Sequence, residues 1–247
     1  MQYLSVKEGP KDVSRIILGC MRMPSLSAEE AARQIEEAVA LGINFFDHAT
    51  CYGRGDAEAR FGEALRKTAL KREDLWIQDK CGLCFERNEF DWSKENIIKS
   101  VEESLKRLQV EYLDVLLLHR PDLIYEPEEV ADAFQNLESS GKVRFFGVSN
   151  VNDMTTERSI DRDNGLLDYC RLEEITIQAW SPLQFGKFEG CFVDHPAFPE
   201  LNQALGSLAE KYGVSKTAIA VSWILRHPAK MQVVAGTMHP EHLRQYC

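Results

Sequence analysis

The sequence predicts a single α/β domain over residues 1–247, of the (β/α)8-barrel type but incomplete, with seven recognisable core strands. Short apolar runs alternate with stretches of helical spacing along the chain, which indicates right-handed crossovers and a parallel sheet. The runs are nearly all apolar, as strands are when both faces of a sheet are covered. A length of 247 residues is usual for a barrel of this class, and no low-complexity tract divides the chain.

The apolar runs give the predicted strands. A closed barrel of this class has eight strands, so the pattern is one strand short. The predicted strands occupy residues 15–19, 44–49, 75–80, 113–119, 144–150, 175–180 and 232–237.

Helical patterns lie between these runs and carry start and stop signals. Ser27, with Glu30 three residues later, predicts a capping box, and Gly42 is the matching stop signal. Ser93 is a second expected cap, and basic residues follow in the last turns of its helix. The predicted helices occupy residues 27–42, 93–109, 126–142 and 215–228.

An open, doubly wound sheet is the alternative architecture. If such a sheet bound a dinucleotide, a G-x-G-x-x-G turn would follow an early strand. The chain contains no such motif, which favours the barrel.

Composition excludes several classes of partner. The formal net charge of −10 argues against nucleic acids and anionic membranes. The first residues lack the apolar core of a secretion signal, and no apolar run approaches the roughly 20 residues of a membrane span. The seven cysteines are scattered, which is typical of reduced thiols, so we expect a cytoplasmic protein.

Polar side chains stand where several predicted strands end. Asp47 and His48 close one run and Tyr52 follows in its loop, while Lys80 and His119 close the next two runs. Because the carboxyl ends of barrel strands share one rim, we expect Asp47, Tyr52, Lys80 and His119 to converge there. We expect His48 to be structural.

These four residue types together can deliver a proton to a carbonyl oxygen. A free tyrosine has a pKa of about 10, and a nearby ammonium group favours its phenolate form and lowers that pKa. A buried ammonium group needs a carboxylate partner, which Asp47 can supply, and His119 can orient the carbonyl group. Carbonyl reduction also needs hydride, which must come from a cofactor because no side chain carries it.

At this point the sequence resembles the aldo-keto reductase family, in particular a bacterial branch with D-H-A and H-R-P-D motifs. The resemblance implies a (β/α)8 barrel that reduces an aldehyde or ketone, with Tyr52 as proton donor, Lys80 lowering its pKa, Asp47 pairing with Lys80 and His119 orienting the carbonyl. The matching segments are F-F-D-H-A-T-C-Y-G (45–53), Lys80, L-L-L-H-R-P-D (116–122), G-K-V-R-F-F-G-V-S-N (141–150) and A-W-S-P-L (179–183).

The resemblance also implies a nicotinamide cofactor. NADPH is the expected cofactor and NADH the alternative, with Ser149 and Asn150 on the carboxamide and Trp180 stacked on the ring. The other implied cofactor residues are Gly19, Cys20, Ser181, Leu183, Gly236, Thr237 and His242. Arg244 is a further basic residue near the adenosine end.

The chain departs from the family pattern after Asn150. The family's next helix and strand, with an Asn-Gln pair that holds the carboxamide, are missing, and so is its C-terminal helix. Gln178 lies in the following strand and is not that glutamine. The loss leaves two unpaired strand edges, or forces 144–150 and 175–180 to pair directly. A catalytically impaired or inactive relic with a nucleotide-binding or structural role is therefore the alternative function.

Other interpretations of these motifs carry less weight. Cys81 and Cys84 form one C-x-x-C pair, which alone is weak evidence for zinc or redox chemistry. A metal-dependent hydrolase would need His48, His119 and Asp47 as ligands, and Lys80 among them would repel a cation. We therefore expect no metal, a small-molecule carbonyl substrate, and a monomer or weak homo-oligomer.

Overall fold

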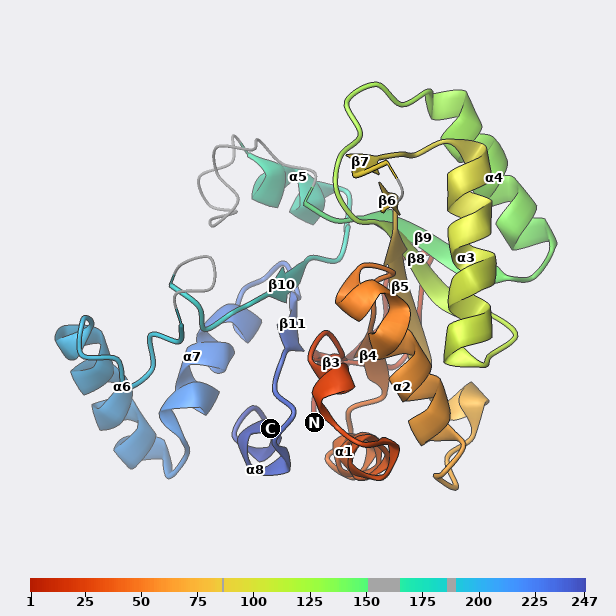
Figure 1. Ribbon diagram of the computed structural model, residues 1–247. Helices are drawn as coiled ribbons and strands as arrows, with labels where there is room; N and C mark the ends of the chain where they lie inside the picture. Colours follow the sequence, from red (N-terminus) through yellow and green to blue (C-terminus); the bar gives the residue numbers. More distant parts are fainter. Residues whose placement is uncertain (86, 151–164, 186–189) are drawn as a thin grey trace.

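A curled parallel sheet of seven strands forms the centre of the protein in a computed structural model, which describes residues 1–85, 87–150, 165–185 and 190–247 (Figure 1). All seven predicted strands are confirmed, and the sheet is that of an incomplete barrel. In sheet order the strands are β10 (Gln178–Trp180), β11 (Gln232–Ala235), β3 (Ile16–Gly19), β4 (Phe45–Asp47), β5 (Trp76–Cys81), β8 (Leu113–Leu118) and β9 (Val143–Val148).

The sheet has two edges within the described part of the chain, strands β9 and β10. Strand β9 pairs only with β8, with Val148 beside Leu118, and β10 pairs only with β11, with Trp180 beside Val234. Direct pairing of 144–150 with 175–180 is therefore wrong, and the other expectation, two unpaired edges, is confirmed.

Two small antiparallel hairpins flank the sheet. One joins β1 (Tyr3–Leu4) to β2 (Val13–Ser14), and the other joins β6 (Leu83–Cys84) to β7 (Glu89–Phe90). The second hairpin follows β5 directly, so it stands at the carboxyl end of the sheet, where Lys80 lies.

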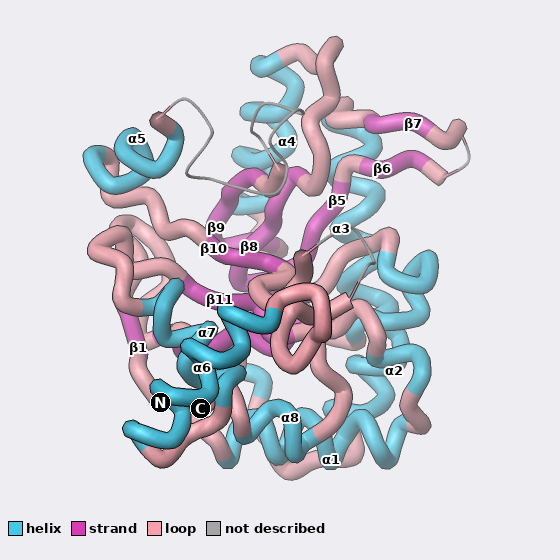
Figure 2. The backbone as a smooth tube through the Cα atoms, turned by 90° about the vertical axis from the view of Figure 1, so that its left-hand side faces the viewer, coloured by secondary structure: helices cyan, strands magenta, loops and turns pink. Residues whose placement is uncertain are grey.

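Helices surround the outside of the curled strands (Figure 2). The predicted capping box is confirmed: the Ser27 side chain accepts from the backbone N–H of Glu30, whose carboxylate accepts from the N–H of Ser27. The four predicted helices are confirmed, and α2, α5, α6 and α8 are additional. The helices are α1 (Ala28–Ala40), α2 (Asp56–Leu65), α3 (Lys94–Leu108), α4 (Pro127–Ser139), α5 (Leu166–Leu172), α6 (Pro199–Tyr212), α7 (Lys216–Leu225) and α8 (Pro240–Arg244), with 3-10 turns η1 (Met23–Ser25), η2 (Tyr52–Gly55) and η3 (Arg72–Asp74). None of the helices in these ranges is long and apolar enough to cross a membrane.

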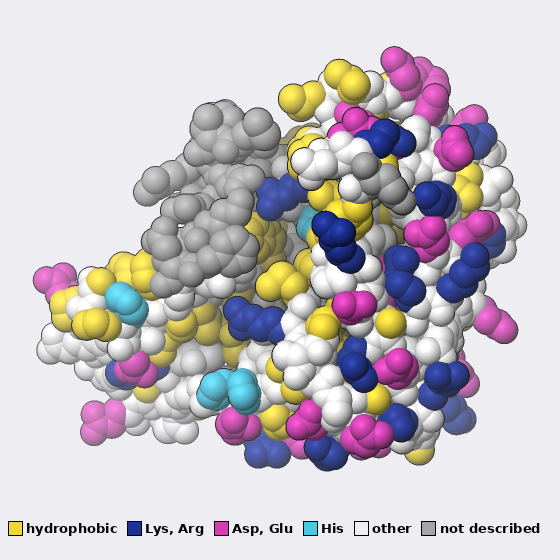
Figure 3. Space-filling view, in the orientation of Figure 1, with side chains coloured by type: hydrophobic (Ala, Val, Ile, Leu, Met, Phe, Trp, Pro, Cys, Tyr) yellow, Lys and Arg dark blue, Asp and Glu magenta, His cyan; other side chains and the backbone are white. Residues whose placement is uncertain are grey.

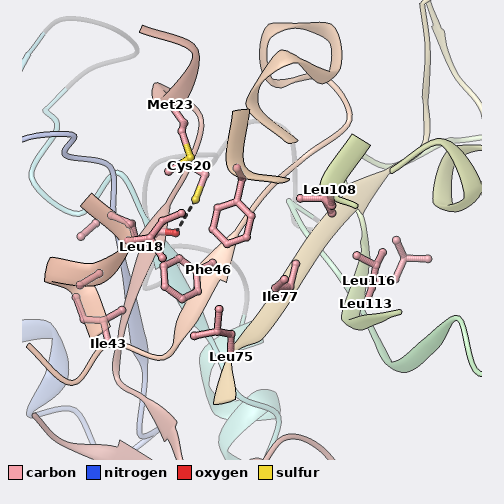
Figure 4. Packing of buried hydrophobic residues seen from close by; sticks show 14 of the residues in the cluster. Leu18, Cys20, Met23, Ile43, Phe46, Leu75, Ile77, Leu108, Leu113 and Leu116 are labelled. Atoms are coloured by element: carbon pink, nitrogen blue, oxygen red, sulfur yellow. Dashed lines mark hydrogen bonds between the residues drawn. The ribbon is translucent and has the colours of Figure 1, made fainter. Parts of the chain in front are cut away.

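The strands alternate between an outer apolar face and an inner face that mixes apolar and polar groups. On β4, Phe46 packs in the large core between sheet and helices (Figure 4). Phe45 lies in a smaller inner cluster. Successive strand residues point to opposite faces, so Asp47 shares the inner face with Phe45. The same alternation on β5 sends Ile77 outward and sets Gln78 and Lys80 inward. The outer core therefore fixes the strands, and the inner face carries the polar groups.

Helices α2 and α3 approach so closely that only a glycine fits between them. A Cβ atom on Gly62 would lie 2.6 Å from the carbonyl oxygens of both Arg107 and Leu108. We predict that Gly62→Ala lowers the melting temperature, because backbone must move to admit the methyl group. Gly206→Ala in α6 is the matched control: its nearest neighbour is the flexible Lys216 Cε at 3.4 Å. That substitution should stabilise by about 0.5–1 kcal/mol, because alanine is the better helix former. Equal melting temperatures for the two variants would contradict this account of the contact.

Candidate active site

The four expected catalytic residues meet at the carboxyl rim of the sheet. Asp47 ends β4, Lys80 lies one residue before the end of β5, His119 follows β8, and Tyr52 begins η2. All four line one cavity of about 2490 Å³. Figure 3 shows this side of the molecule hollowed, with basic and histidine side chains beside the hollow. Ligand sites usually measure about 300–1000 Å³, so the open barrel gives more room than a small substrate needs.

Asp47 and Lys80 form a buried ion pair at the centre of this rim. The Nζ of Lys80 donates to Oδ1 of Asp47 at 2.5 Å and to the carbonyl oxygen of His48 at 2.8 Å. The two residues are only 4% and 5% exposed. Burial alone would lower the pKa of Lys80, but Asp47, with help from Tyr52, outweighs it and raises the pKa above its usual value. Lys80 is therefore a fixed positive charge.

Tyr52 lies beside this charge with its proton held firmly. The Nζ of Lys80 is 5.1 Å from the centre of the Tyr52 ring. Burial raises the pKa of Tyr52 to about 12, although Lys80 acts in the opposite direction. Lys80 therefore acts to lower the pKa of Tyr52, as expected, but burial raises that pKa by more. Tyr52 is a protonated phenol across the physiological pH range, which is the form that can donate.

His119 faces Tyr52 and is neutral. The two rings are 6.1 Å apart and nearly perpendicular, at 89°. Burial, reinforced by the charges of Lys80 and Arg120, lowers the pKa of His119 to about 3. Two neutral hydrogen-bond donors thus share one corner of the cavity.

Cys51 contacts His119, and this contact was not anticipated from the sequence. Its Sγ lies 3.4 Å from Nδ1 of His119. Burial raises the pKa of the Cys51 thiol to about 11, so the sulfur keeps its proton. The donor in this contact depends on the tautomer of His119: when the thiol donates to Nδ1, Nε2 of His119 carries the ring proton. That tautomer can donate to a carbonyl oxygen.

His48 is structural, as expected. It is fully buried, its ring packs edge-on against Phe61 at 4.6 Å, and neither ring nitrogen has a hydrogen-bond partner among the described residues. Burial lowers its pKa to about 3, so it stays uncharged beside Lys80.

Nine of the ten expected cofactor residues line the same cavity. They are Gly19, Ser149, Asn150, Trp180, Ser181, Leu183, Gly236, Thr237 and His242. Asn150 is tied to the catalytic rim, because its Nδ2 donates to the carbonyl oxygen of His119 at 2.8 Å. Trp180 ends the edge strand β10 with 49% of its surface exposed.

The tenth, Cys20, does not face the cavity. Its side chain is fully buried in the outer core beside Met23, and its Sγ lies 3.5 Å from the carbonyl oxygen of Leu18 (Figure 4). Gly19 turns to the inner side at the end of β3, so the following side chain turns outward. The Cys20 side chain therefore does not line the cavity, and a role of Cys20 in cofactor binding stays a prediction.

Basic groups near the adenosine end differ from those expected. Arg244 is engaged outside the cavity, where its Nε donates to Glu37 at 2.6 Å. Arg22 lies closer to the expected position: its Nη1 is 3.4 Å from the carbonyl oxygen of Gly236. The His242 ring is 5.1 Å from that of His239.

The two cysteines of the C-x-x-C pair are not joined in a disulfide. Cys84, Glu89 and Asp91 lie close enough together to ligate a metal ion, but Arg87 forms ion pairs with both carboxylates. The arginine already neutralises the negative charge that these two carboxylates could offer to a cation.

Asp79 and Glu58 are two buried acidic residues on the side of β5 opposite to Lys80. Asp79 points to the outer face of β5, where both carboxylates are fully buried. Burial raises the pKa of Asp79 well above its ordinary value, and the charge of Glu58 raises it further. Arg107 donates to Glu58 at 2.9 Å, so Glu58 has a cationic partner and Asp79 is the acid that keeps a proton.

Comparison with known proteins identifies the chain. The fold is that of an α/β barrel oxidoreductase, and the aldo/keto reductase family matches residues 15–162 and 154–247. The chain therefore belongs to the aldo-keto reductase family, whose members are NAD(P)H-dependent oxidoreductases. The two matched segments meet where the sequence departs from the family pattern.

The relatives share most of their length with the chain. The oxidoreductase YcsN of Bacillus subtilis is 34% identical over 93% of this chain and 86% of its own. A 6-dehydroglucose reductase of Agrobacterium fabrum is 32% identical over 94% and 87%. The alignment with YcsN spans 262 positions, more than the 247 residues of this chain, so part of that relative has no counterpart here.

Solved structures agree on the fold. The thermostable aldo-keto reductase Tm1743, in complex with epalrestat, superposes with a TM-score of 0.79 at 24% identity and covers 99% of this chain and 92% of its own. The glycerol dehydrogenase AKR11B4 of Gluconobacter oxydans superposes with the same score and covers 99% and 88%.

We predict that Asp79→Asn stabilises the protein, and more so as pH rises. The folded-state pKa of Asp79 lies above the unfolded value of about 3.9. Folding therefore binds a proton, and the wild type loses stability as pH rises from that value through the folded pKa. Asparagine removes this titration and keeps the oxygen that accepts from the backbone N–H of Lys80.

Melting curves from pH 5 to pH 8 test this prediction. Each kcal/mol added to the free energy of unfolding should raise the melting temperature by roughly 2–4 °C in a chain of this size. Asp132→Asn is the matched control, because that carboxylate is exposed and pairs only with Lys94 in the described structure. An Asp79→Asn variant that melts below the wild type at every pH would show that the carboxylate is charged and stabilising.

Proposed function

We propose that the protein reduces an aldehyde or ketone to an alcohol with NADPH, and that Tyr52 donates the proton. The supporting observation is the placement of Tyr52 between a fixed ammonium charge and a neutral imidazole in one cavity. The Lys80 charge lies 5.1 Å from the Tyr52 ring, and the His119 ring lies 6.1 Å away.

In this proposal the carbonyl oxygen accepts from the Tyr52 hydroxyl and from Nε2–H of His119. The cofactor, when bound, supplies hydride to the carbonyl carbon. Negative charge then develops on the oxygen, and Tyr52 transfers its proton to it. Lys80 stabilises the phenolate that remains, which ground-state burial alone would disfavour. Asp47 keeps Lys80 charged and in place.

The residues present fit a nicotinamide cofactor along the rim. Trp180 offers a half-exposed indole face that lines the cavity, and Ser149 and Asn150 offer polar groups directly after the opposite edge strand β9. Asn150 is held by its bond to the His119 carbonyl, which links the carboxamide site to the catalytic corner. Ser181, Leu183, Gly19, Gly236 and Thr237 would line the remainder of the cofactor path.

NADPH is preferred in this proposal because of Arg22 and His242. Both line the cavity near Gly236, where the adenosine 2′-phosphate would lie, while Arg244 is engaged by Glu37. A guanidinium group is well suited to a phosphate. NADH is the alternative cofactor.

The supporting observation for the compartment is that none of the seven cysteines, all of which lie in the described residues, is joined in a disulfide. We further propose a cytoplasmic enzyme that acts on a small-molecule carbonyl compound as a monomer or weak homo-oligomer. The proposed domain is the whole chain, 1–247.

An impaired reductase that keeps only nucleotide binding or a structural role is the second candidate. The observation that favours it is the pair of free edges, β9 and β10, on the two sides of the cofactor path. In the described residues, no strand lies between β9 and β10 that could carry a residue to hold the carboxamide group of the cofactor. Binding and turnover measurements on the same protein separate the two candidates.

Tyr52→Phe should abolish carbonyl reduction while cofactor binding persists. General acid catalysis is worth about 10²- to 10⁴-fold, so kcat should fall at least a hundredfold. The NADPH-induced rise in melting temperature should stay at the wild-type value. Tyr112→Phe is the matched control, because that ring packs on Arg72 and Arg144 outside the cavity. Turnover retained in Tyr52→Phe would mean that another group supplies the proton.

Titration with each cofactor tests whether the cofactor path is intact. NADPH at about 100 times its dissociation constant should add roughly 2.7 kcal/mol of stability and quench tryptophan fluorescence. Arg22→Leu should weaken NADPH about tenfold through the lost phosphate contact and leave NADH nearly unchanged. Arg244→Leu is the control and should bind both cofactors as the wild type does. A cooperative melt that neither cofactor shifts would support the impaired candidate.

A further inference from the structure

Three glutamines on the inner face of the sheet form a connected series of hydrogen bonds. Gln78 lies on β5, Gln178 on β10 and Gln232 on β11. Gln78 and Gln178 form a reciprocal amide pair, with N···O distances of 2.9 and 3.1 Å, and Gln178 donates to Gln232 at 3.2 Å. Gln78 and Gln232 are 1% and 0% exposed. We call these three residues the amide ladder.

Both ends of the ladder terminate on groups that can only accept. At one end Nε2 of Gln78 donates to Oδ1 of Asp47 at 2.7 Å, and at the other Nε2 of Gln232 donates to the Ser14 carbonyl oxygen at 2.9 Å. Each terminal amide must therefore turn its oxygen toward Gln178. The Gln178 NH₂ group then donates to both oxygens, and its own oxygen accepts from Gln78. The two ends impose the same orientation on every amide, so the arrangement is unique.

The ladder crosses the interior of the curled sheet. In the sheet, β5 and β10 are separated by β4, β3 and β11, so no backbone pairing joins them. In the described part of the chain, β10 pairs with a strand on one side only. The Gln78–Gln178 pair connects it to β5 across the interior of the curled sheet. Trp180 lies two residues beyond Gln178, on the same face of β10. The ladder therefore connects the strand that carries this indole to the carboxylate that holds Lys80.

We propose that Gln78 and Gln178 are positioning residues for carbonyl reduction. Gln78 fixes the orientation of Asp47, and through it that of Lys80. Gln178 orients the Gln78 amide and holds edge strand β10 at the distance from β5 that this amide pair requires. The incomplete sheet thereby keeps its catalytic pair aligned without a strand between β9 and β10 in the described part of the chain. This inference rests on the proposed reductase function.

The test is single-turnover reduction with enzyme and NADPH at equal concentrations well above the dissociation constant, on a carbonyl substrate that the wild type turns over, with the amplitude taken from the first phase. The amplitude reports how many molecules are folded and active, whereas the rate constant reports how well the groups are aligned. Gln78→Met keeps the side-chain volume and removes the donor to Asp47. Its rate constant should fall by the order of tenfold to a hundredfold at unchanged amplitude. Gln178→Met should lower it less, and the double variant should be no slower than Gln78→Met, because Gln178 acts through Gln78.

Gln78→Glu adds a readout that a merely structural role would not move. The introduced carboxyl group would repel Asp47 when it is ionised, whereas in its protonated form it can donate to Asp47 as the amide does. The rate constant of this variant should therefore lie below that of Gln78→Met at pH 9 and approach the wild-type value as pH falls to 5. Gly62→Ala is the stability control, since it acts through the α2–α3 contact and should leave the rate constant unchanged.

Each outcome decides between the proposals. Rate constants within twofold of the wild type in both Gln78 variants, with only amplitude or melting temperature reduced, would overturn the positioning role and leave the reductase function standing. Wild-type enzyme with no turnover of any carbonyl compound, despite a cooperative melt, would overturn the reductase function and the positioning role together.

Discussion

The buried ion pair between Asp47 and Lys80 is the interaction on which the candidate site depends. Taking two charges out of water is costly unless geometry and hydrogen bonds compensate. Here Lys80 also donates to the His48 carbonyl oxygen, and Asp47 also accepts from Gln78. The pair is therefore a hydrogen-bonded network between neighbouring parallel strands. It can exist only where the outer core, with Phe46 and Ile77, holds those strands in register.

The position of this pair keeps it away from the two edges of the described sheet. Strands β4, β5 and β8, which carry or precede Asp47, Tyr52, Lys80 and His119, lie side by side within the sheet, and each is paired on both sides. The edges are β9 and β10, and the expected carboxamide and ring-stacking residues lie at their ends. An unpaired edge strand has fewer backbone constraints than a central one. The two edges of the described sheet therefore lie along the expected cofactor path, away from the corner that holds the four expected catalytic residues.

Sequence alone predicted what depends on local pattern. The seven strands follow from apolar runs, and the catalytic four follow from polar residues at strand ends, such as Lys80 after L-W-I-Q-D. Residue-by-residue alternation could have corrected Cys20, which must face opposite to Gly19. The amide ladder could not be anticipated, because pairing Gln78 with Gln178 requires knowing how the sheet curls over 100 residues of separation. The Cys51–His119 contact depends likewise on the path of η2 across the rim.

The balance of charge and protonation sets what the corner can do. Lys80 and Asp47 cancel, while burial keeps Tyr52 protonated and His119 neutral, so these four residues together carry no net charge at this corner and present two hydrogen-bond donors. A neutral carbonyl group can enter it without repulsion. Negative charge that then develops on its oxygen meets donors already in place and an ammonium group beyond them, so little reorganisation is needed. The same burial that makes Tyr52 a weak acid at rest makes its interaction with Lys80 stronger once the proton has moved. In the proposed reaction, the phenolate of Tyr52 is unfavourable before hydride transfer and becomes favourable once charge develops on the substrate, and this balance ties proton transfer to the arrival of hydride.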